Sequence, residues 1–245
     1  HQYYLRKKEL DWLDFKNYGK ESFRDIQSTE ILSLEQCHKF LPELGYLAIV
    51  IPDGILTNSS LQYVRDNIEE LFRIVAVVSL PQTAFTSTGA GVKSSVLFLR
   101  KHKNKSSEKI SNLKAKLKEK VKTDSKYLKT IEQWEKEKNE AIKELEKVAK
   151  EKNPKAVKKQ IDEMIKEDKT KLQQSFTDKT NLLKEELTEK YFNEKQKALI
   201  DYPIFMAIAE DIGYDATGRN TNNNELIEIS SESAKFIKHI NKTEK

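Results

Sequence analysis

Short apolar runs between residues 45 and 100 predict three β-strands. Tyr46 to Ile51 is a continuous apolar run closed by Pro52-Asp53-Gly54, which predicts a strand that is buried on both faces and ends in a turn. Ile74 to Leu80 predicts a second buried strand, which Pro81 closes, and Val96 to Leu99 predicts a third. A loop rich in threonine, serine and glycine separates the last two strands.

Helical spacing of apolar residues predicts a helix on each side of the first strand. Leu61, Val64, Ile68, Leu71 and Phe72 recur at helical intervals, and Ser59 or Ser60 is the predicted N-cap. Upstream, Ser28-Thr29 precede an amphipathic segment that ends near Pro42 and Gly45.

The order of these elements predicts an α/β fold. Two buried strands joined by a helix form a parallel β-α-β unit, and such units hold their sites on the loops beyond the carboxyl ends of the strands. Here those loops are residues 52–60 and 81–95. This order of helices and strands is typical of the second half of a doubly wound sheet.

The composition changes after Arg100 to a lysine- and glutamate-rich segment that extends to Ala198. Its sparse apolar residues recur at intervals of three, four and seven, which predicts a narrow coiled-coil seam. Asn153-Pro154 interrupts the pattern near its middle, because proline cannot continue a helix without a kink or break. We therefore expect an antiparallel helical hairpin with arms of roughly 60 Å, the first interrupted near residues 122–125.

The remaining segment returns to a globular composition. Ile204 to Ile212 predicts a short amphipathic helix that Gly213 ends, and Phe236, Ile237 and Ile240 predict a last helix. The predicted divisions are residues 1–102 as a partial α/β domain, 103–198 as the coiled-coil hairpin, and 199–245 as a segment that packs back on the α/β part.

Composition restricts the class of protein only loosely. Of the 245 residues, 37% are hydrophobic and 34% are charged, and the net charge of +5 permits contact with nucleic acid without requiring it. The single cysteine, Cys37, excludes an internal disulfide and fits a reducing cytoplasm. No apolar stretch has the length of a membrane span, so we expect a cytoplasmic protein without membrane contact.

Few residues suggest chemistry on their own. The four histidines are scattered, so no zinc-type spacing exists and we expect no metal site. Gly89-Ala90-Gly91 precedes a strand rather than a helix, which favours a flexible turn over a phosphate-binding loop. Asp53 lies at the end of a strand, where a functional carboxylate could lie, but Pro-Asp-Gly is also an ordinary turn sequence.

Phe85 and Lys93 each admit two interpretations. An aromatic ring in the loop beyond a strand could stack on an unpaired base, but a core aromatic under the loop is the commoner case. Lys93, beside Ser94, could contact a phosphate, although an isolated lysine is usually a solvated surface residue. In the helical segment, interleaved glutamates favour a solvated coiled coil over a DNA-binding surface.

Three blocks of sequence together resemble a known family. Residues 29–68 (TEILSLEQCHKFLPELGYLAIVIPDGILTNSSLQYVRDNI), 77–101 (VVSLPQTAFTSTGAGVKSSVLFLRK) and 202–219 (YPIFMAIAEDIGYDATGR) resemble, in this order, the modification subunits of type I restriction-modification systems. These subunits are adenine-N6 DNA methyltransferases.

The resemblance implies a Rossmann-like methyltransferase fold, S-adenosylmethionine as methyl donor and an adenine flipped out of the duplex. The family's strand-end loop falls on Pro52, Asp53 and Gly54, and its base-stacking aromatic falls on Phe85. Its Gly-Val-Lys-Thr sequence falls on residues 91–94, where Ser94 replaces threonine and keeps a hydroxyl. The resemblance thus assigns base binding to Phe85, Lys93 and Ser94.

Two motifs of the family are absent from the sequence. The family binds its cofactor with a glycine-rich loop and catalyses with Asn-Pro-Pro-Tyr or Asn-Pro-Pro-Phe, and neither sequence occurs here. We therefore expect the carboxyl-terminal part of a methyltransferase, with no catalytic residue of its own, no assignable cofactor-binding residue, and S-adenosylmethionine bound mainly by residues upstream. Alone, this chain is expected to be inactive.

The resemblance also implies partners. These are double-stranded DNA, a specificity subunit and, as a further candidate, a restriction subunit. The helical hairpin would either dock the specificity subunit or clamp DNA. The alternative is a non-catalytic protein, either a coiled-coil scaffold or a DNA-binding and assembly module, built on a degenerate methyltransferase remnant.

Overall fold

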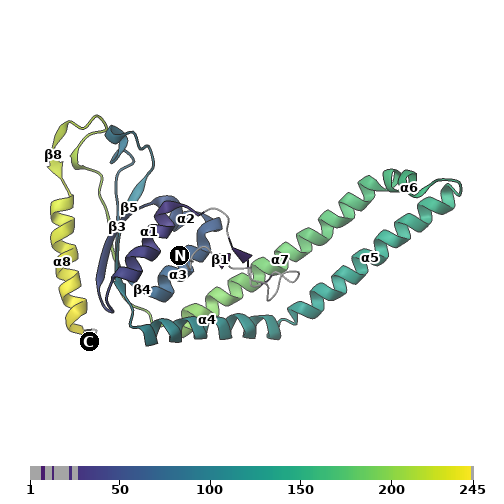
Figure 1. The fold of residues 1–245 in the computed structure, drawn as a ribbon, viewed down its shortest axis with the longest axis horizontal. Coiled ribbons are helices and arrows are strands. Elements are labelled where there is room, and N and C mark those ends of the chain that lie inside the picture. Colours follow the sequence, from purple (N-terminus) through teal and green to yellow (C-terminus); the bar gives the residue numbers. More distant parts are fainter. Residues whose placement is uncertain (1–6, 9–12, 14–21, 24–26, 244–245) are drawn as a thin grey trace. The chain divides into compact units, whose positions relative to one another are not determined.

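The computed structural model describes residues 7–8, 13, 22–23 and 27–243 (Figure 1). The chain forms two compact units, which are described in turn. The first comprises His1–Glu9, Glu21–Asn112 and Asp201–Lys245, and the second comprises Leu10–Lys20 and Leu113–Ile200. The predicted irregular start of the chain lies mostly outside the described residues, where only the short strands β1 (Lys7–Lys8) and β2 (Ser22–Phe23) are defined and pair with each other.

A mixed four-stranded sheet forms the centre of the first unit, in the order β3-β5-β4-β6. Strand β5 is antiparallel to both β3 and β4, and β6 is parallel to β4. The strands are β3 (Tyr46–Pro52), β4 (Phe72–Ser79), β5 (Ser94–Lys101) and β6 (Phe205–Ile208).

The three predicted strands are confirmed, and the two that helices join run parallel, as predicted. The sequence did not predict that β5 lies between them. Val96 of β5 is opposite Val50 on one side and Val78 on the other. The loop after β4 returns the chain antiparallel into the gap, so β3 and β4 still point the same way without sharing hydrogen bonds.

Helices cover one face of the sheet. They are α1 (Thr29–Phe40), α2 (Asp53–Thr57), the 3-10 turn η2 (Ser59–Leu61) and α3 (Gln62–Leu71). Their apolar residues form one core with the sheet: Ile31, Leu34, Ile51, Ile55, Val64, Ile68, Phe72, Leu97 and Leu99. The predicted cap at Ser59 or Ser60 is wrong, because Asn58 Oδ1 accepts the Ser60 N–H at 2.9 Å, and Phe72 belongs to β4 rather than to the helix.

The prediction that β3 is buried on both faces is also wrong. Ile51 is 1% exposed and faces the helices, whereas Val50, on the opposite face, is 49% exposed. Alternation of this kind is expected of a strand that packs on one face only.

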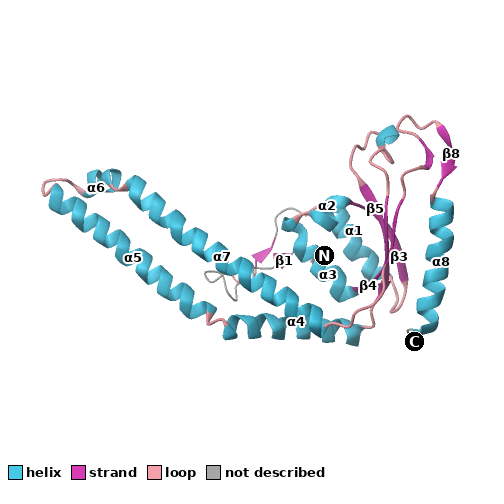
Figure 2. Ribbon diagram, turned by 180° about the vertical axis from the view of Figure 1, so that it is seen from behind, coloured by secondary structure: helices cyan, strands magenta, loops and turns pink. Residues whose placement is uncertain are grey.

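Helix α8 (Leu226–Thr243) lies on the other side of the sheet from α1 and α3 (Figures 1 and 2). The Tyr46 hydroxyl donates to Asn241 Oδ1 at 2.6 Å, and the rings of Phe205 and Phe236 lie 6.0 Å apart. The predicted last helix is therefore confirmed, and it is longer than its apolar residues suggested.

The predicted helix from Ile204 to Ile212 is wrong. The segment forms β6, and β7 (Ile212–Tyr214) then pairs with β8 (Asn220–Asn224). The backbone of this segment pairs with β4, from Ala76↔Phe205 to Ser79↔Ile208, and not with itself as in a helix. Gly213, at φ 91°, does not end a helix but lies within β7.

The second unit is helical. Helix α4 (Asn104–Asp124) begins in the first unit and enters the second at Leu113, and it is followed by α5 (Tyr127–Lys152), α6 (Lys158–Met164) and α7 (Lys166–Ala198). The predicted interruptions are confirmed: α4 ends at Asp124, and α5 ends directly before Asn153-Pro154. Helices α5 and α7 contact each other. The coiled-coil seam itself stays a prediction.

Two apolar clusters stabilise the helical unit. The larger joins Leu13, Val121, Tyr127, Ile131, Leu187 and Tyr191, and the smaller joins Ala149, Ile161 and Ile165. Leu13 is only 1% exposed, and the Tyr127 hydroxyl donates to its carbonyl oxygen at 2.5 Å. Among the described residues, no helix is both long and apolar enough to cross a bilayer.

Candidate functional site

The carboxyl ends of β3 and β4 and the amino end of β5 lie at one edge of the sheet. There the Asp53 N–H donates to the Lys93 carbonyl at 3.0 Å, and the Leu80 N–H donates to the Ser94 carbonyl at 3.1 Å. These bonds bring together the two loops that the sequence indicated, residues 52–60 and 81–95.

Asp53 fixes the first of these loops. It begins α2, and its Oδ1 accepts the hydroxyl of Ser95 at 2.6 Å, while Ser95 is 2% exposed. The Asp53 carbonyl also accepts the Thr57 hydroxyl at 3.0 Å. The neighbouring Pro52 pairs with Ser94 in the sheet register, and Gly54 has open space where a Cβ would lie. Within the described contacts, Asp53 therefore acts as a structural residue of the turn.

Arg65 stabilises the same loop, a role that no sequence pattern indicated. Its NH1 donates to the carbonyls of Ile55 at 2.9 Å and Asn58 at 2.8 Å, and its NH2 donates to Gln62 Oε1 at 2.6 Å. In the sequence, Arg65 is one of several polar residues on the solvent side of a helix.

Phe85 lies half-buried at the start of the second loop. It packs against the cluster of Leu80, Ala84, Ala209 and Ile212, so the interpretation as a core aromatic holds for part of the ring. The Phe85 carbonyl accepts the Ala90 N–H at 3.0 Å and the Thr88 hydroxyl at 2.8 Å. These bonds give the loop a defined conformation around the 3-10 turn η3 (Thr86–Thr88) and Gly89, whose φ is 86°.

The other two predicted base-binding residues differ in accessibility. The side chain of Lys93 is exposed, whereas Ser94 is 7% exposed and its hydroxyl donates to the Val92 carbonyl at 3.2 Å. Gln82 ties the two sides of the loop, because its Nε2 donates to the Gly91 carbonyl at 2.8 Å. Of this group, Lys93 and the free part of Phe85 are accessible to a ligand.

The carboxyl-terminal segment, which the sequence predicts to pack back on the α/β part, supports the Phe85 loop. No sequence pattern indicated this contact with the loop. The Tyr214 hydroxyl donates to the Ala84 carbonyl at 3.1 Å, and a Cβ on Gly218 would lie 3.5 Å from Ser87 Cβ. Asp215 Oδ1 accepts N–H bonds from Thr217 and Arg219 and the Thr217 hydroxyl. These hydrogen bonds lower the pKa of the Asp215 carboxyl, with the Thr217 hydroxyl as the largest cause.

The two histidines with shifted pKa values lie at the opposite end of the sheet. Burial lowers the pKa of His38 to about 4, and the positive charge of Lys101 adds to this shift. Burial also lowers the pKa of His102. Lys101 Nζ donates to the carbonyls of His38 and Leu41, so this region has a structural role in joining α1 to β5.

The described residues do not form a recognisable cofactor or metal site. They contain no group of three or more histidine, cysteine, aspartate or glutamate side chains that could hold a metal. S-adenosylmethionine needs a glycine-rich turn in the family that the sequence resembles, but here α2 follows β3 directly at Asp53, whose carboxylate already binds Ser95. This end of the sheet therefore does not fit the cofactor by itself.

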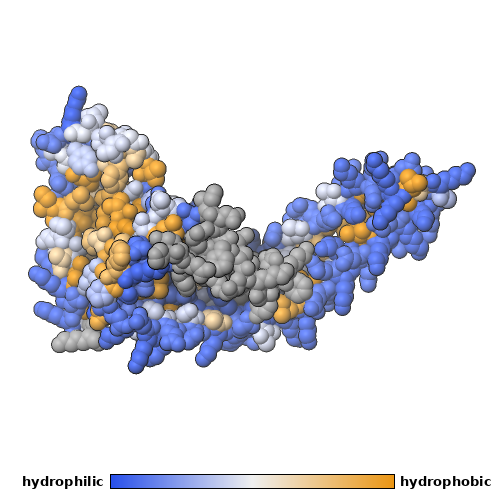
Figure 3. All heavy atoms as spheres, viewed as in Figure 1, coloured by the Kyte–Doolittle hydropathy of each residue, from blue (hydrophilic) through white to orange (hydrophobic). Residues whose placement is uncertain are grey.

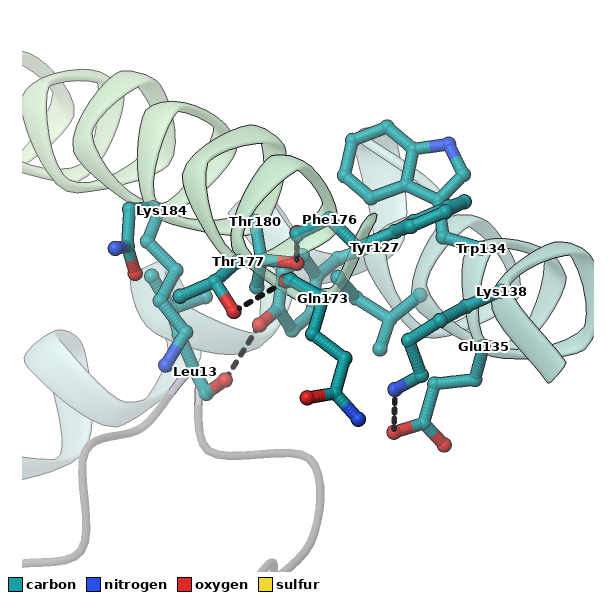
Figure 4. A pocket seen from close by; sticks show the side chains of 12 residues that line it. Leu13, Tyr127, Trp134, Glu135, Lys138, Gln173, Phe176, Thr177, Thr180 and Lys184 are labelled. Atoms are coloured by element: carbon teal, nitrogen blue, oxygen red, sulfur yellow. Dashed lines mark hydrogen bonds and ion pairs between the residues drawn. The ribbon is translucent and has the colours of Figure 1, made fainter. Parts of the chain in front are cut away.

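A pocket of about 420 Å³ lies in the helical unit (Figure 4). Leu13, Tyr127, Trp134 and Phe176 form its apolar part, and Lys138, paired with Glu135 at 3.8 Å, lies at its polar part. Its polar groups bond mainly to neighbouring backbone or to each other, so we assign it a packing role.

Comparison with known proteins identifies the family. A family model described as N-6 DNA methylase matches residues 5–185. The chain belongs to the N-6 DNA methylase family. The matched residues include the Phe85 loop and most of the helical unit, whereas the block at 202–219 lies beyond them.

One solved structure is similar to part of the chain. It is described as a class I S-adenosylmethionine-dependent methyltransferase of Listeria monocytogenes. The match has 27% sequence identity and a TM-score of 0.28, and it covers 34% of this chain and 24% of that chain. No curated protein matches the chain.

Proposed function

We propose that the protein transfers a methyl group from S-adenosylmethionine to N6 of adenine in DNA, as the modification subunit of a type I restriction-modification system. The observation that carries the proposal is the N-6 DNA methylase match over residues 5–185, which includes the loop with Phe85 and Lys93. In this proposal the chain supplies the base-binding loop rather than the catalytic motif.

The loop has groups suited to an extruded nucleotide. Phe85 is anchored on one side by Leu80 and Ala84 and is partly accessible, so its ring can stack on a flipped base without first being ordered. Lys93 is exposed at the same edge, where its ammonium can contact a phosphate. Ser94 has a positioning role, because its hydroxyl bonds to the Val92 carbonyl and its carbonyl accepts the Leu80 N–H.

Cofactor binding and catalysis belong, in this proposal, to residues upstream. The glycine-rich loop and the Asn-Pro-Pro-aromatic motif are absent from the sequence. Within the described residues no strand pairs with the outer edge of β3. Upstream strands that continue a Rossmann-like sheet would satisfy this edge.

The proposed partners are double-stranded DNA, a specificity subunit and a restriction subunit. The helical unit is the proposed docking arm for the specificity subunit, which its long helices and their largely hydrophilic surface in Figure 3 support. A deletion of residues 103–197 that left assembly unchanged would exclude this role.

Methyl transfer from labelled S-adenosylmethionine tests the proposal. The chain alone is compared with a chain extended upstream through both missing motifs, each with the specificity subunit present. We expect label in DNA only with the extended chain. Phe85→Ala should lower the rate at least tenfold, whereas Phe85→Trp, which keeps a stacking ring, should retain most of it. Phe40→Ala, at a 78% exposed ring on α1, is the control.

A second candidate is a non-catalytic scaffold, which the missing motifs and the long helical unit favour. If the extended chain transfers no label with its specificity partner and cofactor present, the enzyme proposal fails and the scaffold function replaces it.

A further inference from the structure

We propose that one face of α4 binds the phosphate backbone of duplex DNA through Lys105, Lys109, Lys116 and Lys120, the lysine stripe. The inference rests on the proposed function, because it assigns the DNA contact of that methyltransferase to one helix and withholds it from α5 and α7.

The first observation is an imbalance of charge among the long helices. Helix α4 has seven lysines and three acidic residues. Helix α5 has seven lysines and seven acidic residues, and α7 has eight lysines and seven acidic residues. Because the net charge of the whole chain is only +5, the positive excess is concentrated on α4. Concentrated positive charge is the electrostatic signature of a nucleic-acid contact.

The second observation is that the excess lies on one face. At about 100° per residue, the four stripe positions fall within an arc of about 60° on an uninterrupted helix. All four side chains are exposed. Val121 and Lys114 lie on the opposite side of α4 and are buried, at 6% and 2% exposure. Packing thus orients the helix so that the stripe faces solvent, as the hydrophilic surface along α4 in Figure 3 illustrates.

Three acidic residues, Glu108, Glu119 and Glu194, lie near the four lysines of the stripe. Glu119 pairs with Lys122, which is 6% exposed and outside the stripe. Lys120 pairs with Glu194 at 3.3 Å, but the two side chains are 57% and 36% exposed. An exposed pair of this kind contributes little, so a phosphate can replace the carboxylate.

The dimensions of the stripe suit a duplex. From Lys105 to Lys120 it is roughly 22 Å long, about two thirds of one turn of B-DNA. The ammonium groups of lysine suit phosphate oxygens, so the stripe fits contact with the DNA backbone.

Salt-dependent binding of the full chain to a 30-base-pair duplex tests the inference. Replacement of all four stripe lysines by glutamine should reduce the slope of log K against log salt by about 3 to 4, because each phosphate contact contributes about 0.9. The matched control replaces Lys129, Lys136, Lys143 and Lys150, four exposed lysines of α5, by glutamine. The control has the same change in charge and should alter the slope by less than about 1.

Three results would overturn the inference: equal effects of the two quadruple variants, no salt-dependent binding by the unaltered chain, or tighter binding of an RNA duplex than of a DNA duplex. Melting temperatures of both variants, expected to match that of the unaltered chain, exclude unfolding as the cause of a loss. The proposed function is tested separately. If the extended methyltransferase transfers label with the same KM for DNA after the stripe is replaced, the inference fails while the proposed function stands.

Discussion

At the scale of single residues, the strand-end site depends on side chains that bond to backbone or to one another. Asp53 binds Ser95 across the sheet edge, Gln82 closes the Phe85 loop, and Tyr214 holds the carbonyl next to Phe85. Each of these bonds fixes a loop that would otherwise be free to vary, so their loss should affect both stability and function.

Asp53→Ala should lower the free energy of unfolding by about 1 to 2 kcal/mol, because it leaves the buried Ser95 hydroxyl without its acceptor. Asp53→Asn keeps an acceptor oxygen and should cost less. Denaturant titration measures both variants. An Asp53→Ala protein as stable as the original would show that the Asp53–Ser95 bond does not stabilise the fold.

His38 should make stability depend on pH. Its pKa is lowered to about 4 in the folded state from an ordinary value of 6.5, so the unfolded chain binds more protons between these values. Stability is therefore fully present above pH 6.5 and falls as the pH is lowered toward 4. Because His38 is only half-buried, we expect a loss of about 1 kcal/mol after allowing for solvent screening.

His38→Gln should flatten this dependence of the free energy of unfolding, measured by urea titration at several pH values. The same substitution at His239, an exposed residue of α8, is the control. If His38→Gln left the pH dependence of the free energy of unfolding unchanged, His38 would not be the residue that causes it.

At the scale of elements, the local sequence was a good guide to which segments form helices or strands. It was a poorer guide to which strands pair with each other. The apolar runs of β3, β4 and β5 and the break at Asn153-Pro154 could be recognised because they depend on local burial and on proline. The position of β5 between β3 and β4 could not, since it depends on pairing between distant residues. The β6 segment was misassigned because Ile204, Phe205, Ile208 and Ile212 fit a helical period, while its edge position next to β4 is a tertiary effect.

The candidate site was predictable to a similar degree. The places of residues 52–54 and Phe85 after strands made them candidates, but their proposed roles came from the family resemblance; the structure brings both loops to one end of the sheet. The contribution of Tyr214 could not be found from the residues alone, because a tyrosine 130 positions from Ala84 gives no local signal of contact.

The junction between α4 and α5 offers a test at this scale. Lys126 has a φ of 53°, in the left-handed region that glycine adopts at no steric cost. Lys126→Gly should therefore keep or raise the thermal stability of the helical unit, by about 0.5 to 1 kcal/mol, whereas Lys126→Val should lower it. Calorimetry of the two variants measures the difference. A glycine variant less stable than the original would show that the positive φ of Lys126 does not strain the backbone.

The contact of Leu13 with α5 offers a second test. Tyr127→Phe removes the hydroxyl that donates to the Leu13 carbonyl in a buried environment, and it should cost about 1 to 2 kcal/mol. Thr130→Val, which removes a hydroxyl bonded to the Lys126 carbonyl at an accessible position on the same helix, should cost less. Equal losses in the two variants would contradict the importance of the Leu13 contact.

At the scale of the whole molecule, the proposals divide the tasks of a DNA methyltransferase among parts of the chain. In these proposals the end of the sheet with Phe85 and Lys93 would receive the target base, α4 would contact the DNA backbone, and α5 to α7 would dock the specificity subunit. Membership of the N-6 DNA methylase family supports the first of these tasks most directly, because the matched residues contain that edge.

The most direct test of this account is the identity of the methylated base. Duplex DNA is incubated with S-adenosylmethionine, the specificity subunit and the chain extended upstream, and its nucleosides are then analysed by mass spectrometry. The account predicts N6-methyladenine, at least tenfold less of it with Phe85→Ala, and none with the present chain alone. DNA without a methylated base, or with methylated cytosine in place of adenine, would contradict it.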